Sequence, residues 1–190
     1  DYLELISAQK EGINRDKNLL IQREIYAQAV DLLTSDNRIL VITGMRRVGK
    51  STLLKQLMKT LNNYCYLNAE DERLIHFRAE NFSQLDEALI EVYGESQTYF
   101  FDEIQNIDKF EIIVRRLQDL GKKVVLTGSN SSLLSMELGT RLTGRYIQIE
   151  LFPFSFKEFL NFKGIEITKD SFLLPQEQVK VKQFLIQLQI

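Results

Sequence analysis

The segment Gly44–Ser51 constrains the fold more than any other part of the sequence, because it joins a phosphate-binding pattern to a particular structural setting. It reads Gly-Met-Arg-Arg-Val-Gly-Lys-Ser and matches the Walker A pattern in full. A short β-branched run, 38–43, precedes it, and apolar residues at helical spacing follow it as far as Leu61. A strand, a glycine-rich loop and a helix are therefore predicted in that order, as a phosphate-binding loop requires.

Each part of this loop has a chemical role toward a nucleoside triphosphate. Gly44 and Gly49 let backbone N–H groups turn toward phosphate oxygens, and the helix that follows presents its positive N-terminal end. Lys50 is predicted to neutralise charge on the β- and γ-phosphates, and Ser51 to bind Mg²⁺ through its hydroxyl. The residues expected to contact the nucleotide phosphates are Gly44, Arg47, Val48, Gly49, Lys50, Ser51 and Thr52.

Strand-like and helix-like segments alternate along the chain. Strands are predicted at 38–43, 64–67, 98–101, 123–127 and 146–151, and helices at 21–33, 51–61, 81–93, 110–120 and 155–162. Ser83 is expected to cap one of these helices and Gly121 to end another. Ser155 and Glu158 have the spacing of a capping box. Because alternating strands and helices imply right-handed crossovers, we expect an α/β domain whose parallel sheet carries helices on both faces.

A second motif follows the apolar strand 98–101, which ends in the carboxylates Asp102 and Glu103. In sheets of this class, ligands bind at the carboxyl ends of the strands. Asp102 is predicted to hold the Mg²⁺ shell through water, and Glu103 to orient or deprotonate the attacking water. Alone, such a strand end favours a solvated surface, but after a complete Walker A motif we favour a Walker B strand.

Candidates for contact with the γ-phosphate lie further along the chain. Ser129 or Asn130, after the strand 123–127, is predicted to sense the γ-phosphate, and a simple turn with a helix cap is an equal alternative. Arg145, and after it Arg141, can stabilise transition-state charge, within the chain or across a subunit interface. A solvated arginine is the alternative for each.

Composition limits the other classes of function. The formal net charge is −2, from 24 basic and 26 acidic residues, so no global positive field argues for nucleic acid. Cys65 is the single cysteine and His76 the single histidine, which argues against a disulfide framework and a cysteine-rich metal site. We expect a cytoplasmic protein without a membrane segment. One ATPase domain with a leading helix is expected at 1–162, and the truncated start of a C-terminal lid or second domain at 163–190.

Taken together, these motifs and their flanks resemble the prokaryotic AAA-type ATPases of the AAA+ superfamily, the type usually followed by a nuclease-like domain of unknown function. The resemblance covers about residues 20–162 and differs at Asn130, where a second serine is expected. It implies a three-layer P-loop NTPase sandwich with a parallel sheet of order 5-1-4-3-2, and Mg-ATP as ligand. The segments that carry it are 44–54, 66–71, 100–105, 126–135, 142–145 and 151–159.

Three functions remain open. The leading one is a Mg-dependent ATPase whose nucleotide state changes the conformation of a C-terminal domain or partner. A regulatory switch with negligible turnover is the second, and a P-loop kinase is the third, although Glu103 argues against a kinase because it would activate water. The adenine contacts are expected to come from the stretch before the first strand, where Ile21, Gln22 and Arg23 open the leading helix. Self-association that supplies an arginine in trans, and a nucleic-acid or protein partner acting through a missing C-terminal domain, are further expectations.

Overall fold

The structure is a computed structural model of the 190-residue chain and describes residues 1–15, 21–129, 144–164 and 179. The chain forms two compact units, 1–153 and 154–190, and each is considered by itself. In the second unit, the described helix is α7 (Phe156–Phe162). The first unit contains the helices α1 (Tyr2–Arg15), α2 (Tyr26–Ser35), α3 (Lys50–Met58), α4 (Phe82–Tyr93) and α5 (Phe110–Asp119), and the strands β1 (Ile39–Thr43), β2 (Cys65–Asn68), β3 (Thr98–Asp102), β4 (Lys123–Gly128) and β5 (Tyr146–Glu150).

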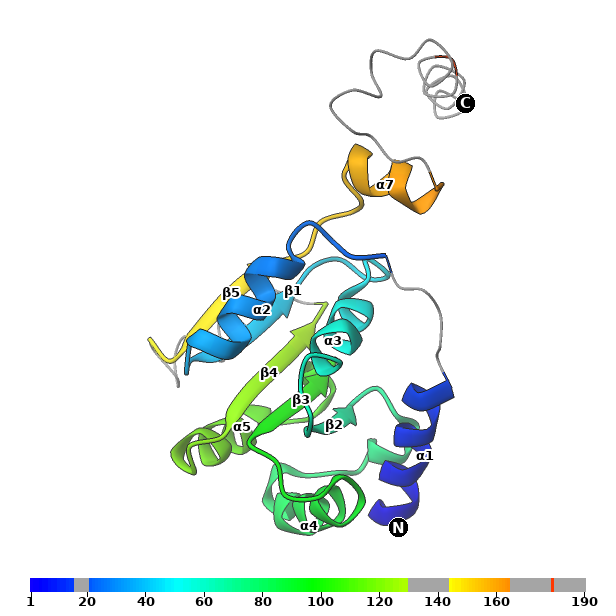
Figure 1. Cartoon of the computed structure of the whole chain (residues 1–190). Helices are drawn as coiled ribbons and strands as arrows, with labels where there is room; N and C mark the ends of the chain where they lie inside the picture. The colour runs from blue at the N-terminus through cyan, green and yellow to red at the C-terminus, as the bar shows by residue number, and fades with distance from the viewer. Residues whose placement is uncertain (16–20, 130–143, 165–178, 180–190) are drawn as a thin grey trace. The chain divides into compact units, whose positions relative to one another are not determined.

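The strands form one parallel sheet with the order β2-β3-β4-β1-β5 (Figure 1). Read from the other edge, this is the expected order 5-1-4-3-2, so the predicted fold class is confirmed. β4 lies between β1 and β3. The loops that leave the carboxyl ends of these strands therefore meet at one edge of the sheet, where ligands bind in folds of this kind.

The sheet is covered on both faces. α2 and α3 pack with one core cluster, and α1, α4 and α5 with the other. Along β1, Ile39 and Val41 belong to the cluster with α1, α4 and α5, whereas Leu40 and Ile42 belong to the cluster with α2 and α3. A strand that is buried on both faces needs apolar residues at consecutive positions, which explains the uninterrupted apolar run that predicts it.

Most of the predicted helix ends are confirmed. The Ser155 hydroxyl accepts from the Glu158 N–H, and the Glu158 carboxylate accepts from the Ser155 N–H, as a capping box requires. Gly121 follows α5 with φ +72°, the left-handed conformation expected after a helix. The cap predicted at Ser83 is wrong, because α4 already begins at Phe82. The Ser83 hydroxyl instead accepts a hydrogen bond from Arg116 at 2.9 Å.

Helix α1 was not among the predicted elements. It packs against α4 and β2, and its Leu5 and Ile6 are fully buried in the core. The Gln9 carboxamide exchanges hydrogen bonds with the backbone of Asn68 in the edge strand β2, donating from Nε2 to the carbonyl at 3.1 Å and accepting from the N–H at 2.9 Å. Gln9 Nε2 also donates to Asp71 at 3.0 Å.

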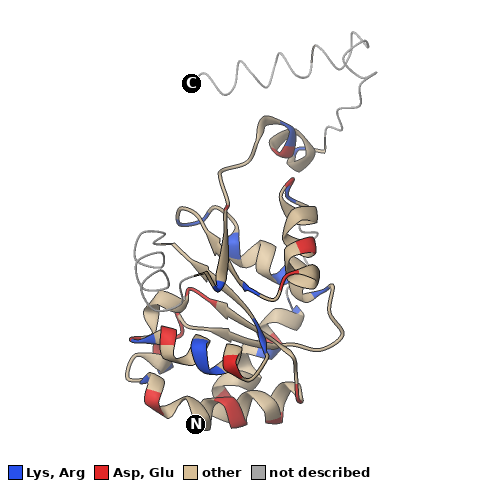
Figure 2. Cartoon of the chain, turned by 90° about the vertical axis from the view of Figure 1, so that its left-hand side faces the viewer, with Lys and Arg blue, Asp and Glu red and all other residues tan. Residues whose placement is uncertain are grey.

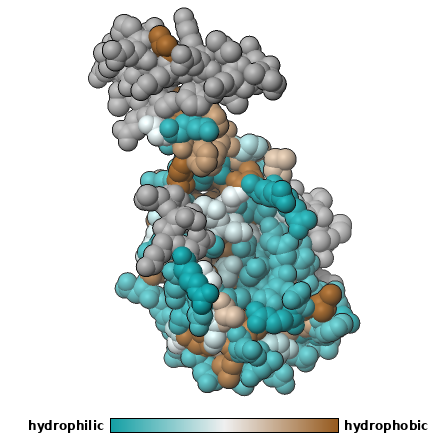
Figure 3. All heavy atoms as spheres, turned by 90° about the vertical axis from the view of Figure 1, so that its right-hand side faces the viewer, coloured by the Kyte–Doolittle hydropathy of each residue, from teal (hydrophilic) through white to brown (hydrophobic). Residues whose placement is uncertain are grey.

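The surface is mixed in charge. Figure 2 shows that Lys and Arg positions alternate with Asp and Glu positions along the described helices and loops, in keeping with the small net charge of −2. The face drawn in Figure 3 is largely hydrophilic, and most of its apolar atoms are scattered. None of the described helices combines the length and apolarity needed to cross a bilayer.

Candidate functional site

The phosphate-binding loop joins β1 to α3 and is built around two glycines with positive φ. Gly44 has φ +147° and Gly49 has φ +102°, conformations that L side chains rarely adopt. A Cβ atom on Gly44 would lie 2.3 Å from the backbone oxygen of Leu151, so this glycine also permits a close approach of two backbone segments. The Leu151 N–H donates to the Thr43 carbonyl at 2.7 Å, which fixes the second segment against the end of β1.

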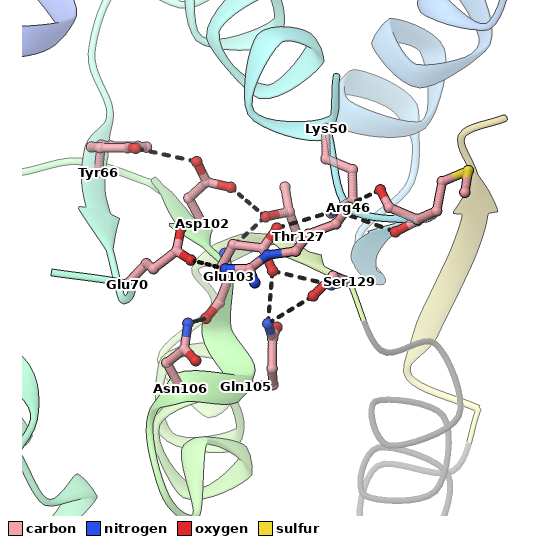
Figure 4. Close-up of polar contacts among 12 residues, drawn as sticks. Arg46, Lys50, Tyr66, Glu70, Asp102, Glu103, Gln105, Asn106, Thr127 and Ser129 are labelled. Atoms are coloured by element: carbon pink, nitrogen blue, oxygen red, sulfur yellow. Dashed lines mark hydrogen bonds and ion pairs between the residues drawn. The ribbon is translucent and has the colours of Figure 1, made fainter. Parts of the chain in front are cut away.

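Lys50 opens α3, and its side chain turns into the loop. The side chain is 2% exposed, and Nζ donates to the carbonyls of Gly44 and Met45, both at 3.2 Å. The same ammonium lies 3.1 Å from Oε1 of Glu103 (Figure 4). The lysine of the first motif and the glutamate of the second are therefore in direct contact.

Asp102 ends β3 with both carboxylate oxygens hydrogen-bonded to hydroxyls. It is 4% exposed; Thr127 Oγ1 donates to Oδ1, and the Tyr66 hydroxyl donates to Oδ2 at 3.4 Å. Burial, together with the nearby Asp102 charge, raises the pKa of Tyr66, so the phenol is a neutral donor. Thr127 Oγ1 also accepts from the Glu103 N–H at 2.9 Å. One buried threonine of β4 thus orients both acidic residues (Figure 4).

Sequence reasoning missed Thr127 and Tyr66. The available signal was the expected sheet order, which makes 64–67 and 123–127 the two neighbours of the strand that carries Asp102. In the structure, Asn68 pairs with Asp102, and Leu126 pairs with Phe101. The next residue of β4 is then Thr127, beside Asp102.

The Glu103 carboxylate is held on both oxygens. Oε1 faces Lys50, while Oε2 accepts from Gln105 Nε2 at 2.7 Å and from the Ser129 N–H at 3.1 Å. Burial by itself would raise the pKa of Glu103, but the donors Gln105, Lys50 and Ser129 outweigh it, and the pKa is lowered. Glu103 is therefore an ionised carboxylate with a fixed orientation.

The two sensor candidates differ in what the structure describes. Ser129 lies next to Glu103 and contacts it through its backbone N–H, while its hydroxyl lies 3.4 Å from Gln105 Nε2. Asn130 lies outside the described residues, as does Arg141. Gln105 was not predicted, although it is two positions beyond Glu103.

The oxygen atoms at this site are suitable ligands for Mg²⁺ bound in the manner that is typical of phosphate-binding loops. Ser51 and Thr52 lie in the first turn of α3 and are partly buried. Within the described ranges, no group of three His, Cys, Asp or Glu residues is placed to hold a metal. Mg²⁺ commonly keeps several waters and takes only one or two protein carboxylates together with substrate phosphates. The hydroxyl of Ser51 and the oriented carboxylate of Asp102 fit that pattern.

Arg23 has a different place from the one expected. The side chain was predicted to contact adenine, but the residue is 5% exposed and donates to the chain's own backbone. Its guanidinium reaches the Val48 carbonyl at 3.0 Å and the Phe152 carbonyl at 2.6 Å. Arg23 thus braces the phosphate-binding loop against the segment that follows β5, and little of its surface remains for a base.

Arg145 lies at the amino ends of the strands, on the opposite side of the sheet from the phosphate-binding loop. Tyr146 pairs with Ile39 at the start of β1, which puts Arg145 beside the amino end of that strand, and its guanidinium lies 3.2 Å from Asp119. A rise of about 3.3 Å per residue along β5 separates Arg145 from the loop edge by roughly 16 Å. The expected role within the same chain is therefore wrong, and a role in trans stays a prediction.

The loop arginines point outward. Arg46 and Arg47 are both exposed, and Arg47 adopts φ +65°. Arg46 forms an ion pair at 2.7 Å with Glu70, which lies in the loop after β2 (Figure 4). An exposed pair of this kind contributes little to stability. The phosphate contact expected from Arg47 stays a prediction.

Comparison with known proteins agrees with this geometry. A protein family described as "AAA domain" matches residues 36–160. The uncharacterized protein MJ1544 of Methanocaldococcus jannaschii is 39% identical over 171 residues, which make up 89% of this chain and 35% of that protein. The chain spans little more than a third of the length of the curated relatives it matches.

Solved structures show the same fold at low sequence identity. The Walker-type ATPase PABY2304 of Pyrococcus abyssi has a TM-score of 0.52 and 18% identity, covering 80% of this chain and 61% of that chain. Hsp104 of S. cerevisiae in complex with ADP has a TM-score of 0.60 and 15% identity, covering 86% of this chain and 26% of that chain. Since the family match takes in well over half of the sequence, the chain belongs to the AAA domain family of P-loop ATPases.

Proposed function

We propose that this chain is a Mg-dependent ATPase module that hydrolyses the terminal phosphoanhydride bond of ATP. The observation that carries the proposal is the ion pair between Lys50 Nζ and Glu103 Oε1, 3.1 Å apart at the carboxyl edge of the sheet. A phosphate-binding lysine and an ionised glutamate in contact bring charge neutralisation and a general base to one place. A P-loop kinase fits less well, because a glutamate that activates water competes with any other acceptor hydroxyl.

The residues of the chain divide the work between binding and proton transfer. The loop amides and Lys50 bind the phosphates, and the ammonium exchanges its contact with Glu103 for the β- and γ-phosphate oxygens. Glu103 then accepts a proton from the attacking water. Thr127 keeps both acidic residues in place. Ser51 and Asp102 would hold Mg²⁺, which would neutralise charge on the phosphates.

We further propose that nucleotide state is passed on through the segment that follows β5. This segment contacts the loop at Gly44, where Leu151 approaches, and at Arg23, which bridges Val48 and Phe152. It leads directly into the second unit, which begins at Phe154. A C-terminal domain or a partner is the proposed recipient, and a nucleic acid, a protein or a second copy supplying an arginine in trans are candidates for that partner. We place the protein in the cytoplasm.

The test is phosphate release by the wild-type chain and by two site variants. Lys50→Ala is expected to lose both ATP binding and turnover. Glu103→Gln is expected to bind ATP while turnover falls by about 100-fold or more, the typical contribution of a general base. The exposed residues Lys59 and Glu87 supply matched controls as Lys59→Ala and Glu87→Gln.

The same experiment separates the alternatives. Tight retention of ATP with no phosphate release from the wild type favours the regulatory switch. Phosphate release that is undiminished in both site variants refutes the assignment of this site. Release that is stimulated tenfold by DNA identifies a nucleic acid as the partner.

A further inference from the structure

Gln105 lies beside the proposed general base and has an unusual set of contacts. It is part of a 3₁₀ turn, Ile104–Asn106, that begins immediately after Glu103. Its Nε2 donates to Glu103 Oε2 at 2.7 Å and lies 3.4 Å from Ser129 Oγ. Its Oε1 is buried and, within the part of the chain that the structure describes, has no hydrogen-bond partner.

The carboxamide orientation follows from the charge of Glu103. With the amide reversed, the Gln105 oxygen would face a carboxylate oxygen at hydrogen-bond distance, which is repulsive. In the observed orientation, the buried carbonyl oxygen has no partner among the described residues, which is unfavourable. The reversed orientation would replace the 2.7 Å donor contact with Glu103 by a repulsive contact between two oxygens, so the contact with Glu103 determines which way Gln105 turns.

The two oxygens of Glu103 have different partners, and this difference matters for the reaction. Oε1 contacts Lys50, whereas Oε2 accepts from Gln105 and from the Ser129 N–H. When Lys50 turns to the phosphates, Oε1 is the oxygen that becomes available to water, while Oε2 keeps both donors. A base acts efficiently only when its accepting oxygen is held within a few tenths of an ångström, and a freely rotating carboxylate does not meet that requirement.

We propose that Gln105 is a positioning residue for ATP hydrolysis, whose Nε2 holds Oε2 of Glu103 so that Oε1 is presented to the attacking water. This inference rests on the proposed ATPase function and assigns Gln105 no contact with the nucleotide. Gln105 therefore affects the rate of the chemical step and leaves the binding of ATP unchanged.

The first test compares Gln105→Leu, which keeps the approximate volume and removes the donor, with the wild type. We expect kcat to fall by about 10-fold to 100-fold, the loss typical of a misplaced catalytic group, with the Kd for ATP within twofold of the wild-type value. Gln105→Glu, which sets a second carboxylate against Glu103, is expected to lower kcat further. An unchanged kcat, or a parallel loss of ATP binding and of Tm that accounts for the lost rate, overturns the proposal.

Gln118 provides the matched control. It is also a partly buried glutamine that donates through Nε2 to one acceptor, the Arg145 carbonyl at 3.2 Å, and its Oε1 is likewise buried without a partner among the described residues. It lies in α5, near the amino edge of the sheet. Gln118→Leu is expected to keep the wild-type kcat, and an equal loss of rate in both variants refutes a specific role for Gln105.

A double-mutant cycle makes the inference testable without turnover. Urea unfolding midpoints are measured for the wild type, Gln105→Leu, Glu103→Ala and the double variant. We expect the two single shifts to be non-additive, because each variant removes the same contact, and additive shifts overturn the proposal. A wild type without phosphate release, together with non-additive shifts, refutes the ATPase function while leaving the contact established. In an active protein, Gln105→Leu is expected to cause no further loss of rate in the Glu103→Ala background.

Discussion

Replacing Gly44 by alanine is expected to strain the phosphate-binding loop in two separable ways. The backbone has φ +147°, a conformation that costs an L residue about 1–3 kcal/mol. The new Cβ would also lie 2.3 Å from the Leu151 oxygen. That oxygen belongs to backbone tied to Thr43 by a 2.7 Å hydrogen bond, so it cannot move away cheaply. Overpacking of this kind adds about 1–3 kcal/mol.

Gly121→Ala is the control that isolates the clash. Gly121 has φ +72°, and a Cβ there would meet no atom within 4 Å among the described residues, so only strain of about 1–2 kcal/mol is expected. The free energy of unfolding of Gly44→Ala, measured by urea unfolding followed by circular dichroism, should be about 4 kcal/mol lower than that of the wild type, and its Tm should be lower by roughly 10 °C. Its affinity for ADP should fall as well, whereas Gly121→Ala should bind normally. Equal unfolding midpoints for the two variants would refute the reasoning.

Two further predictions concern the contacts of Arg23 with the phosphate-binding loop and the stability of the domain at acidic pH. Arg23→Leu removes a charged donor from the Val48 and Phe152 carbonyls, and each such hydrogen bond is worth about 1.5–3 kcal/mol. Because these hydrogen bonds hold the phosphate-binding loop in place, we expect the affinity for nucleotide to fall by about tenfold. Titration with a fluorescent nucleotide measures this affinity, and a wild-type value would contradict the prediction. The Arg73 side chain, against an opposing effect of burial, lowers the pKa of Asp71 below its ordinary value of 3.8. The stability that the ionised Asp71 carboxylate contributes to the fold is therefore fully present above pH 3.8 and is lost as the pH falls below 3.8. Asp71→Asn should flatten this part of the pH dependence of the unfolding midpoint, and an unchanged profile would contradict the assignment.

The core of the sheet could be predicted from sequence because burial on both faces leaves a direct signal. Consecutive apolar residues such as those of β1 and β3 specify strands without reference to any partner. The order of the strands came from the resemblance, since periodicity alone does not say which strands are neighbours. Helix α1 escaped prediction because only two of its residues, Leu5 and Ile6, are buried.

The site was predictable where a motif fixes a residue's place along the chain, and it was not where the place depends on register. Lys50 and Glu103 come together because both follow strands at the same edge. Thr127 and Gln105 act through side-chain hydrogen bonds whose partners depend on the pairing of β3 with β4 and on the turn after β3. Arg23 was misassigned because nearness to the loop in sequence does not reveal that its guanidinium turns inward to backbone carbonyls.

The contact between Gln9 and Asn68 bears on how this domain can be shortened. An edge strand exposes unpaired N–H and C=O groups that can pair with the edge of another molecule. The Gln9 carboxamide, which offers one donor and one acceptor at the spacing of a peptide group, occupies one such position in β2, and α1 packs along the same strand. A version that starts at α2 would keep the phosphate-binding loop but expose this edge, so poor solubility of such a truncation would reflect intermolecular strand pairing.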